Sequence, residues 1–365
     1  MSTLATRPLT HSLHYSQEVL NRVSFLRKDP QFLEDALSHS ETQFVPFDNY
    51  LPYVNERTGF ILKLKKAEIA TLTSQGAFSS NLVFLGLLLS QKSDFVYKSK
   101  YRGTPTFAID VSIKKLSDSS LLDTSKPYKK VESFRDLNKL TVEDSSIVSQ
   151  ARMYLQWLDT HKFCSLCGSK TKPVYAGTQL QCVNEDCKSN KSVSNSCFPR
   201  TDAVVISAIT NKDYSKILLC RSGMPRNKER KLYSCVSGFV EPSETLEVAV
   251  AREIWEEAGL DTQKVEIIAS QPWPFPNNLM IGCVAIVDDK QTPDLTHDCE
   301  LDEVRWVPCS ALERILKLED SESGFIQDES TGLNLPNDRS IAHMLMSVVV
   351  QRNAELRQGP YIQKM

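Results

Sequence analysis

The residues best suited to chemistry in this 365-residue chain are carboxylates within positions 238–260. The segment reads Gly238-Phe-Val-Glu-Pro-Ser-Glu244-Thr-Leu-Glu-Val-Ala-Val-Ala-Arg252-Glu253-Ile-Trp-Glu256-Glu257-Ala-Gly259-Leu260. At about 100° per helical residue, Glu253 and Glu257 lie on the same side of the helix as Leu246 and Val250, within roughly 60° of both. Acids that continue an apolar stripe are costly unless a cation meets them. Because glutamate oxygens suit Mg²⁺ or Mn²⁺, the spacing predicts a metal site for phosphate chemistry.

A helix preceded by a loop must present these acids. Pro242 and Ser243 are expected to open the helix, and Gly259 to stop it. Arg252 is expected to pair with Glu244 or a neighbouring carboxylate and so orient the metal ligands. A salt-bridged surface helix is the alternative for an isolated Arg-Glu-x-x-Glu-Glu sequence. The surrounding glycines, Glu244 and Leu260 favour the metal site instead.

Paired cysteines form a second candidate metal site. Cys164 and Cys167 form one two-cysteine turn, and Cys182 and Cys187 form another. Two such turns supply the four thiolates of a tetrahedral zinc site, which would be structural because no position remains for water. Cys197 competes with Cys187 as fourth ligand, and unligated thiols are the alternative to a metal.

The carboxylate segment resembles the box of the Nudix hydrolases, Gly-x5-Glu-x7-Arg-Glu-U-x-Glu-Glu-x-Gly-U with U apolar, at every position. The resemblance implies an α/β/α sandwich with a mixed sheet and hydrolysis of nucleoside diphosphate derivatives. It implies metal binding by Glu253, Glu256 and Glu257, with Glu257 or a neighbour as general base. Further metal contacts are implied for the carbonyl of Ser237 and for Glu300. Arg252 and Glu244 complete the catalytic set.

A proline-rich loop after the box narrows the substrate. Ser270-Gln-Pro-Trp-Pro-Phe-Pro276 is similar to the signature of the NADH pyrophosphatase branch, which also carries a four-cysteine zinc ribbon. A rigid surface loop is the plainer interpretation of alternating prolines and aromatics. The branch resemblance implies hydrolysis of NADH to reduced nicotinamide mononucleotide and AMP, and removal of NAD caps from RNA by some members.

Substrate contacts follow from the same resemblance, with Phe239 stacking on the nicotinamide or the base. Phe198 stands where the branch usually has tyrosine, and Asn278 where it usually has serine. The implied contacts are Phe198, Phe239, Gln271, Pro272, Trp273, Pro274, Phe275, Pro276, Asn277, Asn278, Met280 and Ala342.

The rest of the chain predicts the scaffold. The fold class is α+β, in four segments: an N-terminal α+β domain at 1–155, a zinc ribbon at 156–199, a Nudix domain at 200–325, and a C-terminal helix and tail at 326–365. Apolar runs in the first segment indicate antiparallel strands. Residues 202–210 and 216–220 are expected to pair around a turn at Asn211, and 145–161 and 340–356 to form helices.

Composition limits the partners. The formal charge of −2 gives no global field for nucleic acid or anionic lipid. No apolar stretch is long enough for a membrane span, and the start lacks the apolar core of a signal peptide. Gln363-Lys364-Met365 resembles a peroxisomal import tripeptide at two positions, with a cytoplasmic location as the alternative. The branch also implies a homodimer.

Two other functions fit the sequence. One is Nudix hydrolysis of ADP-ribose or dinucleoside polyphosphates. The other is a non-catalytic zinc-ribbon module that binds RNA ends, against which the complete set of acids argues. Comparing kcat/KM across these substrates separates the enzymatic alternatives.

Overall fold

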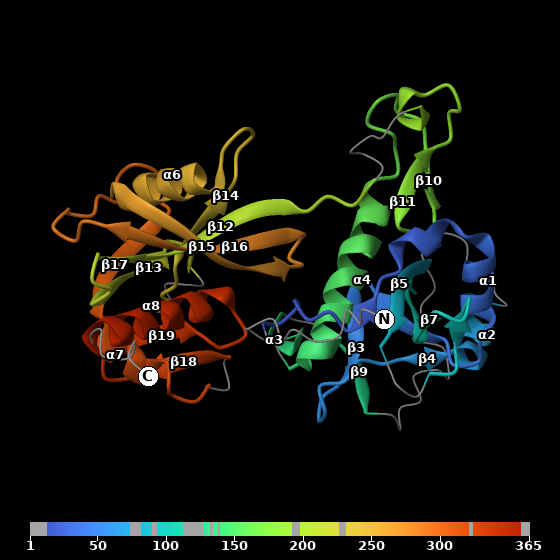
Figure 1. Cartoon of the computed structure of the whole chain (residues 1–365), viewed down its shortest axis with the longest axis horizontal. Coiled ribbons are helices and arrows are strands. Elements are labelled where there is room, and N and C mark those ends of the chain that lie inside the picture. Colours follow the sequence, from blue (N-terminus) through green and yellow to red (C-terminus); the bar gives the residue numbers. More distant parts are fainter. Residues whose placement is uncertain are drawn as a thin grey trace. The chain divides into compact units, whose positions relative to one another are not determined.

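The computed structural model of the protein describes residues 13–73, 82–89, 93–111, 127–131, 134–137, 139–191, 198–225, 231–320 and 324–358. Cys197 and the tripeptide at 363–365 lie outside the described residues. The chain forms two compact units, shown in Figure 1. The N-terminal unit contains residues 15–201 and 274–277, and the C-terminal unit contains residues 1–14, 202–273 and 278–365.

The N-terminal unit is built on a seven-stranded sheet in the order β1-β5-β8-β2-β3-β9, with β4 pairing with β2. Its strands are β1 (Leu20–Asn21), β2 (Gln43–Asp48), β3 (Leu51–Asn55), β4 (Leu64–Lys65), β5 (Leu82–Leu88), β8 (Thr104–Asp110) and β9 (Tyr128–Lys130). β6 (Val96–Tyr97) and β7 (Tyr101–Arg102) form a separate pair. The expectation of antiparallel strands was wrong at one place, since β2 and β8 are parallel.

Helices cover both faces of this sheet. The elements are η1 (Ser24–Lys28), α1 (Pro30–Ser38), α2 (Lys66–Thr73), α3 (Phe134–Leu137) and α4 (Val142–Thr160). One core joins Phe32 of α1 to Phe84 and Phe107 of the sheet, and the other joins Ile147 and Ala151 of α4 to its opposite face. The helix expected at 145–161 is therefore α4, which begins after Thr141, whose side chain accepts a hydrogen bond from the Asp144 amide.

A small ribbon follows α4 (Figure 1). It consists of β10 (Thr171–Val174), β11 (Gln179–Cys182) and η3 (Lys188–Asn190). β10 and β11 are antiparallel, with Thr171 opposite Cys182 and Lys172 opposite Gln181. The buried residues of the ribbon include Cys164, Cys182 and Cys187, which cluster together. A core of three cysteines is small, so the ribbon relies on what those thiols bind.

The C-terminal unit contains a six-stranded mixed sheet in the order β15-β16-β12-β13-β17, with β14 pairing with β12. Its strands are β12 (Asp202–Thr210), β13 (Lys216–Ser222), β14 (Val236–Phe239), β15 (Thr262–Trp273), β16 (Asn278–Val287) and β17 (Leu301–Pro308). β12 and β16 are parallel, and the other pairs are antiparallel. The mixed sheet is as the sequence predicted.

Helices pack on the two faces of this sheet, as Figure 1 shows. α6 (Leu246–Ala258) covers one face, and α7 (Cys309–Ile315) and α8 (Ile341–Gln358) cover the other. Alternation along β12 explains the layers, because Val205 and Ile209 pack with α6 while Ile206 and Ala208 pack with α7 and α8. A hairpin of β18 (Phe325–Asp328) and β19 (Leu333–Pro336) completes the unit. The expected α/β/α sandwich is confirmed.

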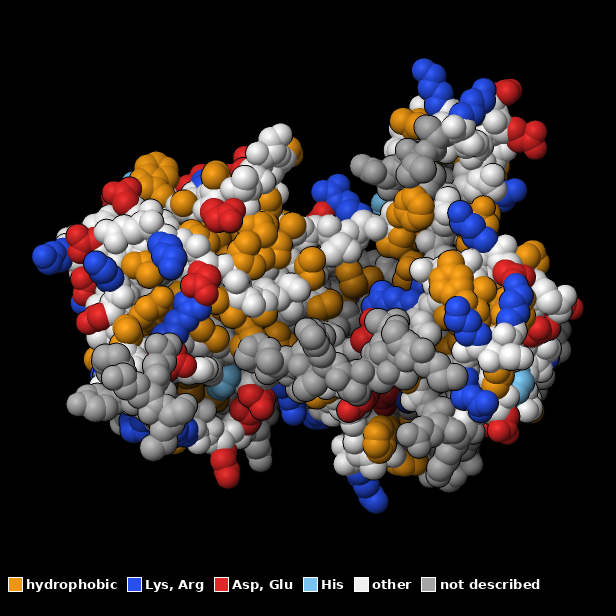
Figure 2. Space-filling view, in the orientation of Figure 1, with side chains coloured by type: hydrophobic (Ala, Val, Ile, Leu, Met, Phe, Trp, Pro, Cys, Tyr) orange, Lys and Arg blue, Asp and Glu red, His pale blue; other side chains and the backbone are white. Residues whose placement is uncertain are grey.

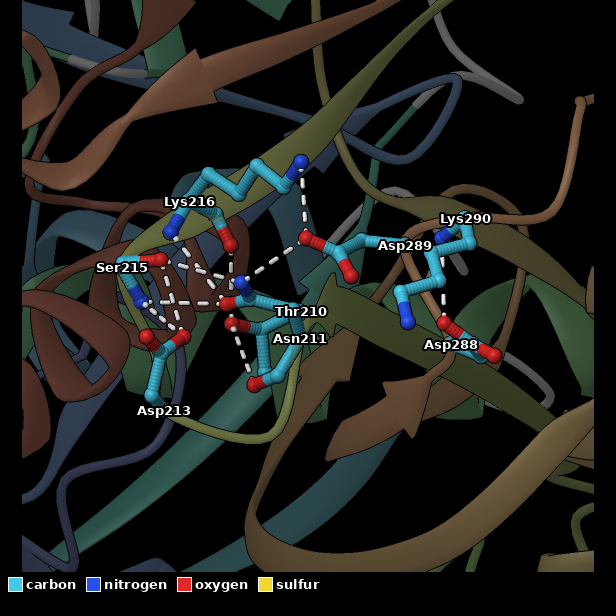
Figure 3. Close-up of polar contacts among 8 residues, drawn as sticks. All are labelled: Thr210, Asn211, Asp213, Ser215, Lys216, Asp288, Asp289 and Lys290. Carbon is cyan, nitrogen blue, oxygen red and sulfur yellow. Dashed lines mark hydrogen bonds and ion pairs between the residues drawn. The ribbon is translucent and has the colours of Figure 1, made fainter.

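The turn expected at Asn211 joins β12 to β13, and its side chains hold it closed (Figure 3). The Asn211 amide donates to Ser215 Oγ at 2.9 Å and to Asp289 at 3.1 Å, and its oxygen accepts from the Ser215 amide at 3.0 Å. The Lys216 ammonium pairs with Asp289 at 2.7 Å. These contacts fix the register of two central strands through a neighbouring loop.

None of the described helices has the length and apolar character that would let it cross a bilayer.

Candidate active site

The acids of residues 238–260 lie on and before α6. The helix begins at Leu246, and the Thr245 hydroxyl caps it by accepting a hydrogen bond from the Val248 amide at 3.3 Å. The expectation that Pro242 and Ser243 open the helix was wrong. Ser243 has a left-handed backbone with φ of 70°, so it belongs to the preceding loop. Gly259 ends the helix with φ of 65°, as the sequence predicted.

Glu257 points into the unit rather than into solvent. Only 5% of its surface is exposed, and Val250 and Ile254 of the same helix lie in the buried core. The expected continuation of the apolar stripe by Glu257 is therefore present. Glu253 is also shielded, with 12% of its side chain exposed, whereas 37% of the Glu256 side chain is exposed.

Gly238 makes room for Glu253. A Cβ atom built on Gly238 would lie 1.9 Å from Cδ of Glu253, far inside any permitted contact. Gly238 belongs to β14, where it pairs with Val205 of β12. Because side chains alternate along a strand, the Glu253 carboxylate occupies the place that a side chain at position 238 would take. This position of the box therefore requires glycine for steric reasons.

Arg252 connects the loop to the helix. Its Nε donates to Glu244 Oε1 at 2.7 Å and its Nη2 to Glu244 Oε2 at 2.9 Å. Nη2 also donates to the carbonyl of Phe239 at 2.8 Å. Nη1 donates to Glu253 at 2.7 Å and to Glu256 at 2.9 Å. The expected pairing of Arg252 with Glu244 is therefore present, and one guanidinium orients three carboxylates.

The carboxylates repel one another around Glu257. Its pKa is raised to about 8, first by burial and then by the charges of Glu253, Glu300, Asp298 and Glu256. Burial likewise raises the pKa of Glu253, despite its bond from Arg252. By contrast, hydrogen bonds from Arg252 lower the pKa of Glu244 to about 2.

This donor set fits a divalent cation. Hard oxygen ligands surround a buried acid that stays protonated near neutral pH unless a positive charge arrives. A cation that binds Glu253 or Glu256 can use the oxygen that Arg252 does not hold. Asp298 was missed by the sequence reasoning, although it lies two residues before the predicted ligand Glu300 in an acidic turn. Glu300 itself is exposed just before β17, and Ser237 is exposed in β14.

Several predicted substrate contacts form one row across the sheet. The strand registers place Gln271 opposite Met280, Met280 beside Val204, and Val204 opposite Phe239. Residues in register on neighbouring strands share a face of the sheet. Phe239 is exposed over 58% of its surface, so its ring is available for stacking.

Gln271 has a different environment from the one its predicted role requires. The side chain is completely buried, and its amide donates to the carbonyls of His14 at 3.0 Å and Arg339 at 2.8 Å. Its oxygen accepts from the Ile341 amide at 2.8 Å, at the first residue of α8. Gln271 thus positions the start of α8, and Ala342 in the first turn of that helix is buried as well.

The remaining predicted contacts divide between the two units. Pro272, Trp273 and Asn278 are half-buried at the ends of β15 and β16, where Trp273 pairs with Asn278. Four loop residues and Phe198 belong to the N-terminal unit. There, Arg152 donates to the Pro274 carbonyl at 2.8 Å and lies over the Phe275 ring. The loop residues are Pro274, Phe275, Pro276 and Asn277.

The four predicted zinc ligands converge in the ribbon. The sulfur atoms of Cys164, Cys167, Cys182 and Cys187 all lie within 4.8 Å of one another. The Cys164 and Cys187 sulfurs are 3.8 Å apart, and those of Cys167 and Cys182 are 3.5 Å apart. Zinc–sulfur bonds of about 2.3 Å give tetrahedral sulfur separations of about 3.8 Å, so the cluster fits zinc.

Comparison with known proteins agrees with both sites. The Nudix domain profile matches residues 199–328, and the NADH pyrophosphatase zinc ribbon profile matches residues 159–189. The chain is 37% identical to NAD-capped RNA hydrolase NPY1 of Saccharomyces cerevisiae, over 94% of this chain and 96% of that protein. It is 33% identical to an NAD-capped RNA hydrolase of Schizosaccharomyces pombe, over 82% of this chain and 84% of that protein.

A third relative extends the likeness to another named activity. The chain is 33% identical to the mitochondrial NAD(P)H pyrophosphatase NUDT13 of Mus musculus, over 67% of this chain and 68% of that protein. The chain matches the profiles of both domains, the Nudix domain and the zinc ribbon. It also matches one relative over nearly the full length of that protein. The chain belongs to the Nudix hydrolase family, in the branch that carries the NADH pyrophosphatase zinc ribbon.

Proposed function

We propose that this protein hydrolyses the pyrophosphate bond of NAD(H) and of NAD-capped RNA with the help of a divalent cation. One observation carries the proposal: buried Glu257 lies among carboxylates that Arg252 orients. The named activities of the relatives, capped-RNA hydrolysis and NAD(P)H pyrophosphate hydrolysis, are those that this site would perform.

The chain's own residues have separate tasks. Glu253, Glu256, Glu257 and Glu300, with the carbonyl of Ser237, would hold the cation. When bound, a divalent cation neutralises pyrophosphate charge and acidifies water for attack on phosphorus. Glu257 would accept the proton that the water loses. Arg252 and Gly238 keep the carboxylates in place, as the hydrogen bonds and the space at position 238 indicate.

The reaction balances with water as the only co-substrate. Water oxygen bonds to one phosphorus, the bridging P–O bond breaks, and the departing phosphate takes the proton. NADH gives reduced nicotinamide mononucleotide and AMP, and NAD-capped RNA gives nicotinamide mononucleotide and 5′-monophosphate RNA. The cation in this proposal is Mg²⁺ or Mn²⁺, since all of the ligands are oxygen atoms.

A substrate panel tests this function. The purified full-length protein is incubated with NADH, NAD-capped RNA, ADP-ribose and a dinucleoside polyphosphate, each with Mg²⁺ or Mn²⁺. We expect the highest kcat/KM values for NADH and NAD-capped RNA. A higher value for ADP-ribose or the polyphosphate would overturn the substrate assignment, and failure to cleave any of the four would overturn the enzymatic proposal. Heavy-oxygen water would identify the attacked phosphorus.

The proposal also covers assembly and location, which rest on the sequence resemblance alone. The protein would form a homodimer and enter peroxisomes through residues 363–365. Light scattering would measure the mass in solution. A fluorescent fusion placed at the N-terminus, with and without residues 363–365, would test import, and a cytoplasmic signal from both versions would contradict it.

A further inference from the structure

The zinc ribbon has two faces of different character. Phe163 pairs with Lys170 in an antiparallel bridge, and the Val183 amide donates to the Lys170 carbonyl at 3.0 Å. Lys170 therefore lies between Phe163 and Val183 on neighbouring strands. One step along the hairpin, Lys172 is opposite Gln181.

Alternation along the strands places these five residues on the outer face. Cys164 and Cys182, which neighbour Phe163 and Val183 in sequence, are buried together with Cys187. Leu180 is buried on the same inner side. The outer residues are all exposed: Phe163, Lys170, Lys172, Gln181 and Val183. We call these five residues the outer ribbon face.

An aromatic ring and unpaired cations dominate the outer ribbon face. Phe163 is exposed over 64% of its surface and Val183 over 48%. Lys162 pairs with Asp159, but neither Lys170 nor Lys172 forms an ion pair with any described residue. The face contains no carboxylate, although Figure 2 shows acidic side chains elsewhere on the ribbon beside basic and hydrophobic ones.

This combination suits a single-stranded nucleic acid. An exposed ring can stack on a base of any type, and flanking ammonium groups can contact phosphates. A protein partner fits less well, because lysine is depleted at the cores of protein interfaces. Free NADH has no extended polyanionic chain that would need such a face, whereas NAD-capped RNA has one.

We propose that the outer ribbon face binds the single-stranded RNA chain that follows the NAD cap, through stacking on Phe163 and phosphate contacts from Lys170 and Lys172. The inference rests on the proposed function and assigns part of the capped substrate to the ribbon. It makes NADH and NAD-capped RNA depend differently on the same residues. A variant of the outer ribbon face can therefore lose RNA binding while it still cleaves NADH.

The test compares matched variants of the zinc- and magnesium-loaded full-length protein. Phe163→Ala and Lys170→Gln/Lys172→Gln alter the outer ribbon face. Phe60→Ala removes another exposed ring of the N-terminal unit, and Lys212→Gln/Lys290→Gln removes two exposed lysines at the turns near Asn211 and Asp289. The substrates are NADH and an unstructured NAD-capped RNA of about 16 nucleotides, the upper site size of folds that bind single strands.

We expect the ribbon variants to keep wild-type kcat/KM for NADH and to lose activity on the capped RNA. Loss of one stacked base corresponds to about a 5- to 150-fold decrease for Phe163→Ala. For the lysine variant, the log–log dependence of RNA affinity on salt should become shallower by about 1.4, the value for two phosphate contacts to a single strand. The control variants should match wild type on both substrates.

Other outcomes would overturn the inference. Ribbon variants that match the controls on capped RNA would show that the RNA does not use this face. Equal losses on NADH and capped RNA, with lowered zinc content or a changed mass in light scattering, would assign the face to folding or to contact between copies of the chain. If the wild-type protein cleaved neither substrate, the proposed function would fail instead.

Discussion

The guanidinium of Arg252 holds the carboxylate of Glu244 through two hydrogen bonds, from Nε to Oε1 at 2.7 Å and from Nη2 to Oε2 at 2.9 Å. Glu244 also accepts a hydrogen bond from the Glu241 amide at 2.9 Å. The loop before α6 is thereby attached to the helix that carries the acids. Planar bidentate pairing of this kind requires arginine.

Replacing Arg252 with lysine should therefore reduce activity although the charge is kept. A lysine ammonium cannot hold Glu244, Glu253 and Glu256 together, so we expect about a 10- to 100-fold loss in kcat/KM for NADH. Glu244→Gln should cause a loss of the same kind, and the double variant should lose less than the product of the two. Steady-state kinetics measures all three. If the loss in the double variant equalled the product of the two single losses, Arg252 and Glu244 would act independently, and the prediction would be wrong.

The acidity of Glu257 predicts how the metal-free protein responds to pH. Its pKa is about 8 in the folded protein against a reference of 4.5, so folding favours the protonated form. Its contribution to stability is complete below pH 4.5 and is lost as the pH rises through 8. We expect the Tm of the metal-free protein to fall over this range, and Mg²⁺ to restore it most at high pH because the cation favours the carboxylate.

Glu257→Gln should remove both the pH response and the activity. A neutral amide cannot accept the proton of the attacking water, so kcat should fall at least about 100-fold. Glu247→Gln changes an exposed acid in the first turn of the same helix and serves as the matched control. Thermal melts and kinetics of both variants decide the matter. Unchanged turnover in Glu257→Gln would refute the assignment of this carboxylate.

Gly238→Ala should displace the Glu253 carboxylate without removing it. The added Cβ would lie 1.9 Å from Cδ of Glu253, so one of the two groups must move. We expect about 10- to 100-fold weaker Mn²⁺ binding and activity. Gly332→Ala is the control, because its Cβ meets open space and tests only the left-handed φ of 68°. It should lower the Tm with kinetics unchanged, and equal kinetic losses in both variants would argue against a specific clash.

The fourth zinc ligand can be identified by metal content. The sulfur atoms of Cys187 and Cys164 are 3.8 Å apart, whereas Cys197 is outside the described residues. We expect Cys187→Ser to lose most of the bound zinc and to lower the Tm, because the ribbon has little other core. Cys197→Ser should retain one zinc per chain. Elemental analysis of the two purified variants gives the answer, and the reverse pattern would assign Cys197.

Gln271→Leu should destabilise the C-terminal unit. The change leaves the Ile341 amide and the carbonyls of His14 and Arg339 without their buried partner. Each unsatisfied buried group costs about 1–3 kcal/mol, so denaturant unfolding should reveal a loss of at least that size. Gln351→Leu on the exposed side of α8 should cost less than about 0.5 kcal/mol. A large rise in KM for NADH with unchanged stability would instead support direct substrate contact by Gln271.

Features with local causes could be predicted from the sequence. The pitch of a helix brings Glu257 onto the apolar stripe of Val250, and glycine in the left-handed region ends α6 at Gly259. The cysteine turns likewise have their own local geometry, so Cys164, Cys167 and Cys182 could be predicted as ligands from the sequence, whereas the choice between Cys187 and Cys197 stayed open.

Features that depend on distant parts of the chain could not be predicted. The parallel pairing of β2 with β8 joins strands more than fifty residues apart. The hydrogen-bond partners of Gln271 are residues near positions 14 and 340, so no local sequence pattern predicts that its side chain is buried. The capping role of Thr245 could have been predicted from the sequence, because a threonine directly before the first apolar helical residue is a capping signal.

The bonds of Gln271 to the start of α8 bear on how the protein can be shortened. The Nudix profile ends at residue 328, but Ile341, Leu345 and Val349 of α8 complete the core beneath the sheet. A fragment that ended at residue 328 would lack α8, so the apolar face of the sheet that α8 covers would be exposed to solvent. The buried side chain of Gln271 would also lose its hydrogen bond from the Ile341 amide. A fragment meant to retain the catalytic unit should therefore include the chain through residue 358, the end of α8.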